Sequence, residues 1–283
     1  MTNIDNLVEV EDIEIDNTES SKDHDWFLPY VDDKSPVIFF VGPAFSGKSM
    51  ALIRLIRYLE TKRFKVVPDA NFRPSDPLYI RWCNEFAHYI YNDNWAPGHS
   101  IWDPLLVKII NPQGRTEAKI IDIPGDAFIR LDGNESRRTY LDYIFRIPKK
   151  RVWVFFVEQD SFLTHLQKAK YVQKINDMHH RIISGKDRVV FLFSKADRFY
   201  EQYDRNGHPV KKLFVKNITQ EYPNIFLKYQ NFGLKKFLHG TYNFQSVVFS
   251  AGDFHSMRDG NHIWTSGRNV YCENLWKTLS KCL

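Results

Sequence analysis

Residues 42–49 have the types and spacing needed to bind a phosphate group. They read G-x-x-x-x-G-K-S and lie between an apolar run at 37–41 and an amphipathic stretch. In such a loop, backbone N–H groups and the start of a helix surround a phosphate, Lys48 reaches the β and γ phosphates, and Ser49 ligates Mg²⁺. The alternative, a chance glycine-rich turn, does not account for both flanking segments. The residues assigned to phosphate binding are Gly42, Pro43, Ala44, Phe45, Ser46, Gly47, Lys48 and Ser49.

An aspartate followed three residues later by glycine ends a further apolar run, at 119–123. Asp122 at the end of a buried strand would lie beside the Mg²⁺ of the phosphate loop, and Gly125 would offer a backbone N–H to a γ phosphate. Asp-x-Pro-Gly is also a common turn, so this interpretation depends on the phosphate loop upstream. That loop is shared by ATPases, nucleoside kinases and GTPases.

A candidate base-reading element follows the apolar run at 189–193. It consists of Ser194, Lys195, Ala196 and Asp197. The carboxylate of Asp197 can accept the N1–H and the exocyclic N2–H of guanine together, whereas adenine lacks this pair of donors. Lys195 would lie along the base with its aliphatic stem. A polar strand end with lysine and aspartate is also ordinary, so the element indicates guanine only together with the others.

The elements that must position these residues follow from the apolar runs. Continuous runs indicate strands covered on both faces, as in a mostly parallel sheet flanked by helices, so we predict an α/β fold. The turn at 111–114 is too short for a crossover helix and predicts one antiparallel strand. Helical spacing follows Lys48 and recurs at 160–183 and 270–283. The predicted strands are near 37–41, 105–110, 119–123, 152–157, 189–193 and 247–249.

Composition limits the class of protein. Hydrophobic residues make up 43% of 283 residues, enough for one core. The three cysteines are scattered, which favours a reducing, cytoplasmic compartment over a disulfide framework or a zinc site. No apolar run has the length of a membrane span. Residues 1–25 hold nine acidic residues and one lysine, so we expect a tail without a core; a strand or a partner-binding motif is the alternative.

Together these elements resemble the Ras-like GTPases of the translation-factor-related class over residues 36–283. Ser194–Asp197 resembles their N/T-K-x-D element. More narrowly, the chain resembles bacterial stand-alone or paired GTPases encoded beside partner proteins. The resemblance implies a P-loop NTPase fold with a Ras-like, mostly parallel six-stranded sheet, one antiparallel edge strand and helices on both faces. Ser250, Ala251 and Gly252 resemble the S-A-K/G element of that class, in which a backbone N–H contacts guanine O6.

The same resemblance implies Mg²⁺ with GTP or GDP as ligand, two switch segments, and a protein effector or a partner from a neighbouring gene. Three residues depart from the family's pattern. Asp126 stands where many members have the glutamine that orients the attacking water, so we expect slow intrinsic hydrolysis with Lys48, Gly125 and Asp126 as the catalytic set. Ala44 replaces a usual glycine and is expected to crowd an arginine finger from a partner. Ser194 lacks the amide that ties this element to the phosphate loop.

We expect one GTPase domain over residues 26–283, with insertions near 62–103 and 200–244. The first insertion lies in the first switch, and Ser100 is the candidate for the hydroxyl that caps Mg²⁺, which gives a metal set of Ser49, Asp122 and Ser100. The second mixes basic and aromatic residues but has no motif that reads nucleic acid. Its charge makes docking of the acidic tail a hypothesis. A GTP-hydrolysing switch is the leading function; a hydrolytically weak scaffold and an ATP-dependent enzyme are the alternatives.

Overall fold

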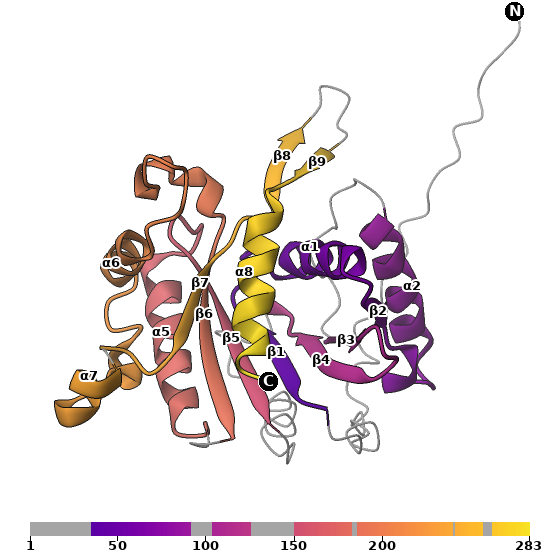
Figure 1. The fold of residues 1–283 in the computed structure, drawn as a ribbon, viewed down its shortest axis with the longest axis horizontal. Coiled ribbons are helices and arrows are strands. Elements are labelled where there is room, and N and C mark those ends of the chain that lie inside the picture. Colours follow the sequence, from indigo (N-terminus) through magenta and orange to yellow (C-terminus); the bar gives the residue numbers. More distant parts are fainter. Residues whose placement is uncertain (1–34, 92–103, 126–149, 183–185, 240, 257–261) are drawn as a thin grey trace, which may run out of the picture.

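The computed structural model describes residues 35–91, 104–125, 150–182, 186–239, 241–256 and 262–283. Its centre is a seven-stranded sheet with the order β2-β3-β4-β1-β5-β6-β7 (Figure 1). The strands are β1 (Val37–Val41), β2 (Lys65–Pro68), β3 (Leu105–Ile110), β4 (Thr116–Asp122), β5 (Arg151–Glu158), β6 (Asp187–Ser194) and β7 (Gln245–Val248), with a separate hairpin of β8 (Gly252–Ser256) and β9 (His262–Ser266). The helices are α1 (Lys48–Thr61), α2 (Pro77–Tyr91), α5 (His165–His179), α6 (Lys211–Glu221), α7 (Gly233–His239) and α8 (Asn269–Ser280), and 3₁₀ turns are η3 (Ala70–Phe72), η5 (Ala196–Arg198), η6 (Tyr200–Gln202) and η7 (Leu227–Tyr229).

The sheet confirms the predicted fold class. Strand β1 is parallel to both β4 and β5, and β5, β6 and β7 continue in parallel. Strand β3 is antiparallel to β4, as the turn at 111–114 predicted, and Gly114 in that turn has a φ of 78°.

Two details of the sheet differ from the prediction. There are seven strands instead of six, and the antiparallel strand β3 lies second from the edge because β2 pairs outside it. Strand β2 has only four residues and one fully buried side chain, Val66, so its apolar run is too short to stand out in the sequence. Its last residue, Pro68, has no N–H to donate, which suits an edge position.

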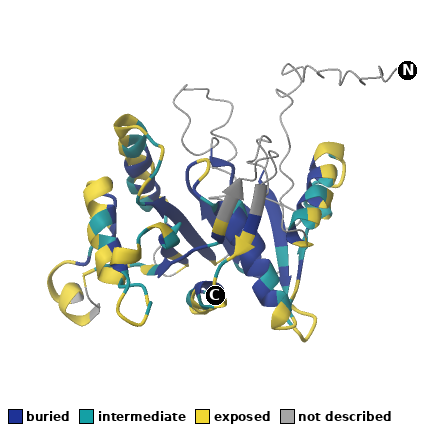
Figure 2. Cartoon of the chain, turned by 90° about the horizontal axis from the view of Figure 1, so that it is seen from above, coloured by how far each residue is buried: buried dark blue, intermediate teal, exposed yellow. Residues whose placement is uncertain are grey.

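Alternation along β1 divides the core into two layers. Ile38 and Phe40 pack with buried residues of α1, α2 and α8, whereas Val37, Phe39 and Val41 pack with those of α5 and α6. Figure 2 shows buried residues on the sheet and on the inner helix faces, and exposed residues outside. Burial of one large apolar side chain contributes roughly 1.5–3 kcal/mol, so these layers hold the strand ends in place.

The two predicted insertions contain regular structure where they are described. Residues 62–91 hold β2, η3 and α2, and residues 200–244 hold η6, α6, η7 and α7. The acidic segment 1–25 lies outside the described residues. The three cysteines are free and buried. Within the described ranges, no helix has both the length and the apolar character needed to cross a bilayer.

Candidate nucleotide-binding site

The phosphate loop joins a buried strand to a buried helix. Every residue of β1 is buried, and most of α1 is as well. The Lys48 side chain is only 5% exposed, and its Nζ donates to the backbone oxygens of Gly42 at 3.0 Å and Pro43 at 2.7 Å. The Ser46 hydroxyl donates to the same Pro43 oxygen at 2.8 Å. A positive charge is therefore held against the loop, at the helix terminus that already favours anions.

Two of the three residues assigned to a metal from the sequence, Ser49 and Asp122, lie together. Asp122 ends β4 opposite Phe40, the second-last residue of β1, and Ser49 is the second residue of α1, which follows the phosphate loop. The Ser49 hydroxyl donates to Asp122 Oδ2 at 2.9 Å, and the aspartate is fully buried. A hydroxyl and a carboxylate are oxygen ligands of the kind that Mg²⁺ uses beside substrate phosphates. These residues fit Mg²⁺ at this place.

Gly125 lies directly against the phosphate loop. A Cβ added there would be 2.0 Å from Ala44 N and 2.4 Å from Pro43 C. Those neighbours are backbone atoms that cannot rotate away, so only glycine fits this approach. The segment after Asp122 thus touches the loop through its backbone. Asp126 and Ser100 lie outside the described residues, and their roles remain predictions.

The candidate base-reading element follows the end of β6. Lys195 has a φ of 54°, and Ala196 N donates to Phe249 O at 3.1 Å, which joins this element to the segment after β7. In that segment Gly252 N donates to Ser250 Oγ at 3.1 Å. Asp197 is half-buried in η5. Ala196 of the first element is therefore hydrogen-bonded to Phe249, the residue just before the second element at 250–252, so the two candidate elements lie near each other.

Ser194 is buried at the end of β6. Its side chain is 5% exposed, and its hydroxyl makes no hydrogen bond with any described residue. Among the described residues, it therefore makes no hydrogen bond to the phosphate loop.

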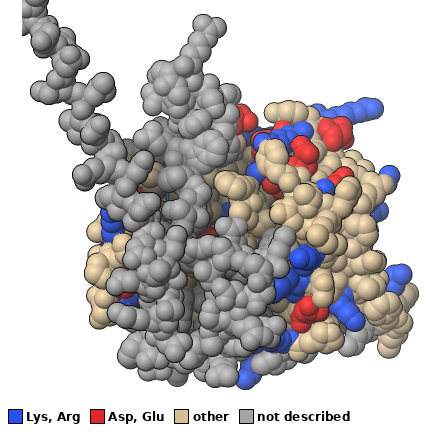
Figure 3. All heavy atoms as spheres, turned by 180° about the vertical axis from the view of Figure 1, so that it is seen from behind, with Lys and Arg blue, Asp and Glu red and all other residues tan. Residues whose placement is uncertain are grey.

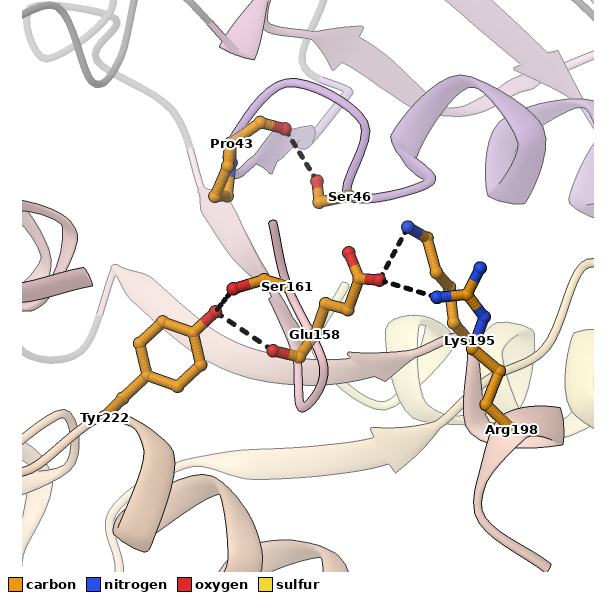
Figure 4. A network of polar contacts seen from close by, with 7 residues as sticks. All are labelled: Pro43, Ser46, Glu158, Ser161, Lys195, Arg198 and Tyr222. Atoms are coloured by element: carbon orange, nitrogen blue, oxygen red, sulfur yellow. Dashed lines mark hydrogen bonds and ion pairs between the residues drawn. The ribbon is translucent and has the colours of Figure 1, made fainter. Parts of the chain in front are cut away.

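Sequence reasoning missed Glu158, a buried carboxylate at the end of β5 (Figure 4). Its Oε1 lies 2.6 Å from Lys195 Nζ and 3.5 Å from an Arg198 guanidinium nitrogen. Its backbone oxygen accepts from the Tyr222 hydroxyl at 3.0 Å, and that hydroxyl also donates to Ser161 Oγ or accepts from it at 2.8 Å. The available signal was a charged residue closing a continuous apolar run, where a parallel strand ends.

The pKa of Glu158 is raised by burial, which outweighs the opposing effects of Lys195 and Arg198. A carboxyl whose folded pKa lies above its unfolded value stabilises the fold below the unfolded pKa and loses that contribution as the pH rises through the folded pKa. We expect wild-type stability, relative to Glu158→Gln, to fall as the pH rises above about 4.5. Urea unfolding of both proteins across pH 4–8 measures this difference.

Glu273→Gln is the matched control, because this glutamate is exposed on α8. This variant controls for the exchange of a glutamate for a glutamine at an exposed position. A Glu158→Gln difference that rises with pH would show that the ion pairs outweigh burial.

All these residues lie at one edge of the sheet. The phosphate loop, Asp122, Glu158 and the element after Ser194 follow the carboxyl ends of β1, β4, β5 and β6, which are parallel neighbours. Open α/β sheets bind ligands at this edge. The described part of this edge therefore brings a buried lysine, a hydroxyl–carboxylate pair and a candidate base pocket together.

No protein-family model and no curated protein matches the sequence. Solved structures resemble the fold at low identity. Toc33 from Arabidopsis thaliana with Mg²⁺ and GMPPNP is 15% identical, with a TM-score of 0.45, over 90% of this chain and 87% of that one. SRb-GTP/SRX from Chaetomium thermophilum is 14% identical (TM-score 0.41; 78% and 93% covered). Bacterial selenocysteine-specific elongation factor EF-Sec is 13% identical, with a TM-score of 0.39. The alignment covers 88% of this chain but only 29% of that factor.

Proposed function

We propose that this chain binds a guanine nucleotide with Mg²⁺ and hydrolyses GTP to GDP and phosphate. The observation that carries the proposal is the 2.9 Å contact between Ser49 and Asp122 beside the buried Lys48. Two motifs 73 residues apart meet there, in the arrangement that holds Mg²⁺ and a triphosphate in P-loop proteins.

Each group has a defined task in this proposal. Backbone N–H groups of residues 42–49 bind the phosphates, and Lys48 moves from the loop carbonyls to the β and γ oxygens. Ser49 and Asp122 would hold Mg²⁺, and the metal would neutralise negative charge on the phosphates. Gly125, which already touches the loop, donates its N–H to the γ phosphate.

The finer parts of the proposal concern switching. Ser100 would cap Mg²⁺ from the first switch, and Asp126 would orient or deprotonate the attacking water from the second. Ordering of two segments around a γ phosphate, and their release after hydrolysis, is the usual way that such a site signals to a protein partner. The carboxylate of Asp126 opposes phosphate charge, so turnover without a partner would be slow.

Nucleotide titration of stripped protein, with phosphate release followed in the same samples, tests the proposal. Stronger binding of GTP and GDP than of ATP, with slow phosphate release, is the expected result. Guanine binding with no turnover would favour the scaffold. Stronger binding of ATP would support only the assignment of the phosphate loop, and it would contradict the role of Asp197 in binding guanine.

Asp197→Asn should change the preferred base from guanine to xanthine. The amide can donate to the xanthine 2-oxygen, whereas it cannot accept both guanine donors. Each charge-assisted hydrogen bond is worth about 1.5–3 kcal/mol, so GTP affinity should fall at least about tenfold while XTP affinity rises. Calorimetry with both nucleotides measures this. Asp177→Asn, at an exposed position of α5, is the control and should leave both affinities unchanged.

A further inference from the structure

A surface far from the nucleotide site exposes large apolar side chains. It is formed by α7 and the residue before it, and we call it the α7 surface. Most of each side chain is in solvent, with exposed fractions of 61–86%. Patches of this kind on soluble proteins mark interaction sites. The side chains are Phe232, Leu234, Phe237 and Leu238.

A hollow of about 590 Å³ lies where the chain enters and leaves α7. Asn231 and Tyr242, which flank α7 in the chain, both line it, and Asn231 N donates to Thr241 O at 2.9 Å. Its apolar lining includes Tyr229, Phe244 and Val189. The hollow therefore offers space for apolar side chains beside a helix that already exposes them.

Basic side chains surround the hollow and the α7 surface. Lys228, Lys236 and Arg188 are exposed around the hollow and α7, and no ion pair among the described residues engages Lys228 or Lys236. Asp187 also lines the hollow, but Arg151 binds it through two contacts of 2.7 Å. Figure 3 shows Lys and Arg side chains scattered over this flank, which lies at the right in that view, among uncharged side chains and a few Asp and Glu. A suitable occupant is acidic and apolar at once.

The N-terminal segment of this chain has that composition. Residues 4–16 hold six acidic residues, six apolar residues and no basic residue. From Val8 onward, single apolar residues are separated by one or two acidic ones. Such a segment presents carboxylates and apolar side chains at neighbouring positions, which matches a surface of exposed phenylalanine, leucine and lysine in both charge and apolarity.

The segment also enters the fold on the correct side. Ser35 precedes β1, and α7 leads into β7; β1, β5, β6 and β7 are successive parallel neighbours, so their starts share one edge, opposite the phosphate loop (Figure 1). Three strand spacings separate β1 from β7, about 14 Å. Residues 17–34 could span about 60 Å if extended. The tail is therefore tethered within reach, at an effective concentration that can approach millimolar.

We propose that residues 4–16 of this chain bind the α7 surface and its hollow in cis. Apolar residues of the segment contact Phe237 and its neighbours, and its carboxylates face Lys228, Lys236 and Arg188. A second copy or an anionic membrane would meet the same surface only from solution, whereas the tail is covalently attached beside it. This proposal does not depend on the nucleotide chemistry.

Site-specific photo-crosslinking in the full-length chain tests the contact. A photoreactive residue at position 237 should crosslink within one molecule to peptides from residues 4–16, identified by mass spectrometry. The same residue at Leu166, which is 61% exposed on α5, is the control and should give no such crosslink. Products between two copies, or no product with the tail, would overturn the proposal.

A binding measurement separates the tail from the rest of the chain. A fluorescent peptide of residues 1–25 should bind the chain that lacks them, and Leu234→Ser with Phe237→Ser should weaken this binding at least tenfold. Both side chains are exposed, so the variant should fold, and its melting temperature verifies this. Raising the salt concentration should also weaken binding. No binding of the peptide, or equal binding by the double variant, would contradict the proposal.

Discussion

Lys48→Ala should lower the affinity for GTP by about thirtyfold or more. The ammonium is buried against the loop, with two backbone oxygens within 3.0 Å, and truncation of one partner of a buried charge contact costs about 2–5 kcal/mol, where 1.4 kcal/mol is tenfold. Calorimetry with GTP and GDP measures the loss, which should affect both nucleotides because Lys48 reaches β as well as γ oxygens.

Two controls make this result specific. Lys216→Ala removes an exposed lysine of α6 and should leave nucleotide affinity unchanged. Lys48→Arg keeps the charge but not the compact ammonium, and should also bind poorly if the contact needs that geometry. Wild-type affinity in Lys48→Ala, with the fold intact, would refute the assignment of the phosphate loop.

Gly125→Ala should reduce GTP hydrolysis at least about tenfold. The added Cβ would be 2.0 Å from Ala44 N, so the segment or the loop must shift, and displacement by about 1 Å can cost about a hundredfold in rate. Because the proposed N–H contact is with the γ phosphate, GTP affinity should fall more than GDP affinity. Single-turnover phosphate release and parallel titrations of both nucleotides measure these effects.

Gly114→Ala is the matched control for a glycine substitution. Gly114 has a φ of 78° and nothing within 4 Å of an added Cβ, so alanine there costs roughly 1–2 kcal/mol of backbone strain without touching the site. We expect lower stability with normal nucleotide affinity and turnover. If Gly125→Ala behaves in the same way, its contact with the loop has no role in catalysis.

The sequence was sufficient for the parts of the fold that have long apolar runs. Strands such as β5, with eight buried residues, and the turn at 111–114 were predictable because continuous apolarity and turn chemistry are local signals. Strand β2 was missed because one buried valine in four residues resembles a loop. The β8–β9 hairpin was missed because its second strand has only two apolar residues, Ile263 and the buried Trp264, which are adjacent and so give no strand alternation.

In the candidate site, too, contacts that follow from local motifs were predictable and contacts that depend on strand order were not. The meeting of Ser49 with Asp122 was predictable, because each belongs to a motif with a fixed place at a strand end. The pairing of Glu158 with Lys195 was not predictable, because it depends on β5 lying beside β6. No local sequence pattern indicates the order of the strands in a sheet. The positions of Ser100 and Asp126 lie outside the described residues, and these assignments remain predictions.

The lengths of the outermost strands determine how this sheet meets other molecules. Within the described residues both edge strands, β2 and β7, have four residues, and β2 ends in a proline. A short edge with a missing N–H donor offers few backbone groups for another chain to extend the sheet. A core this rich in valine, isoleucine and phenylalanine is thereby protected from edge-to-edge aggregation. The described edges therefore leave side chains on helices and loops, more than backbone groups, open to contact with other molecules.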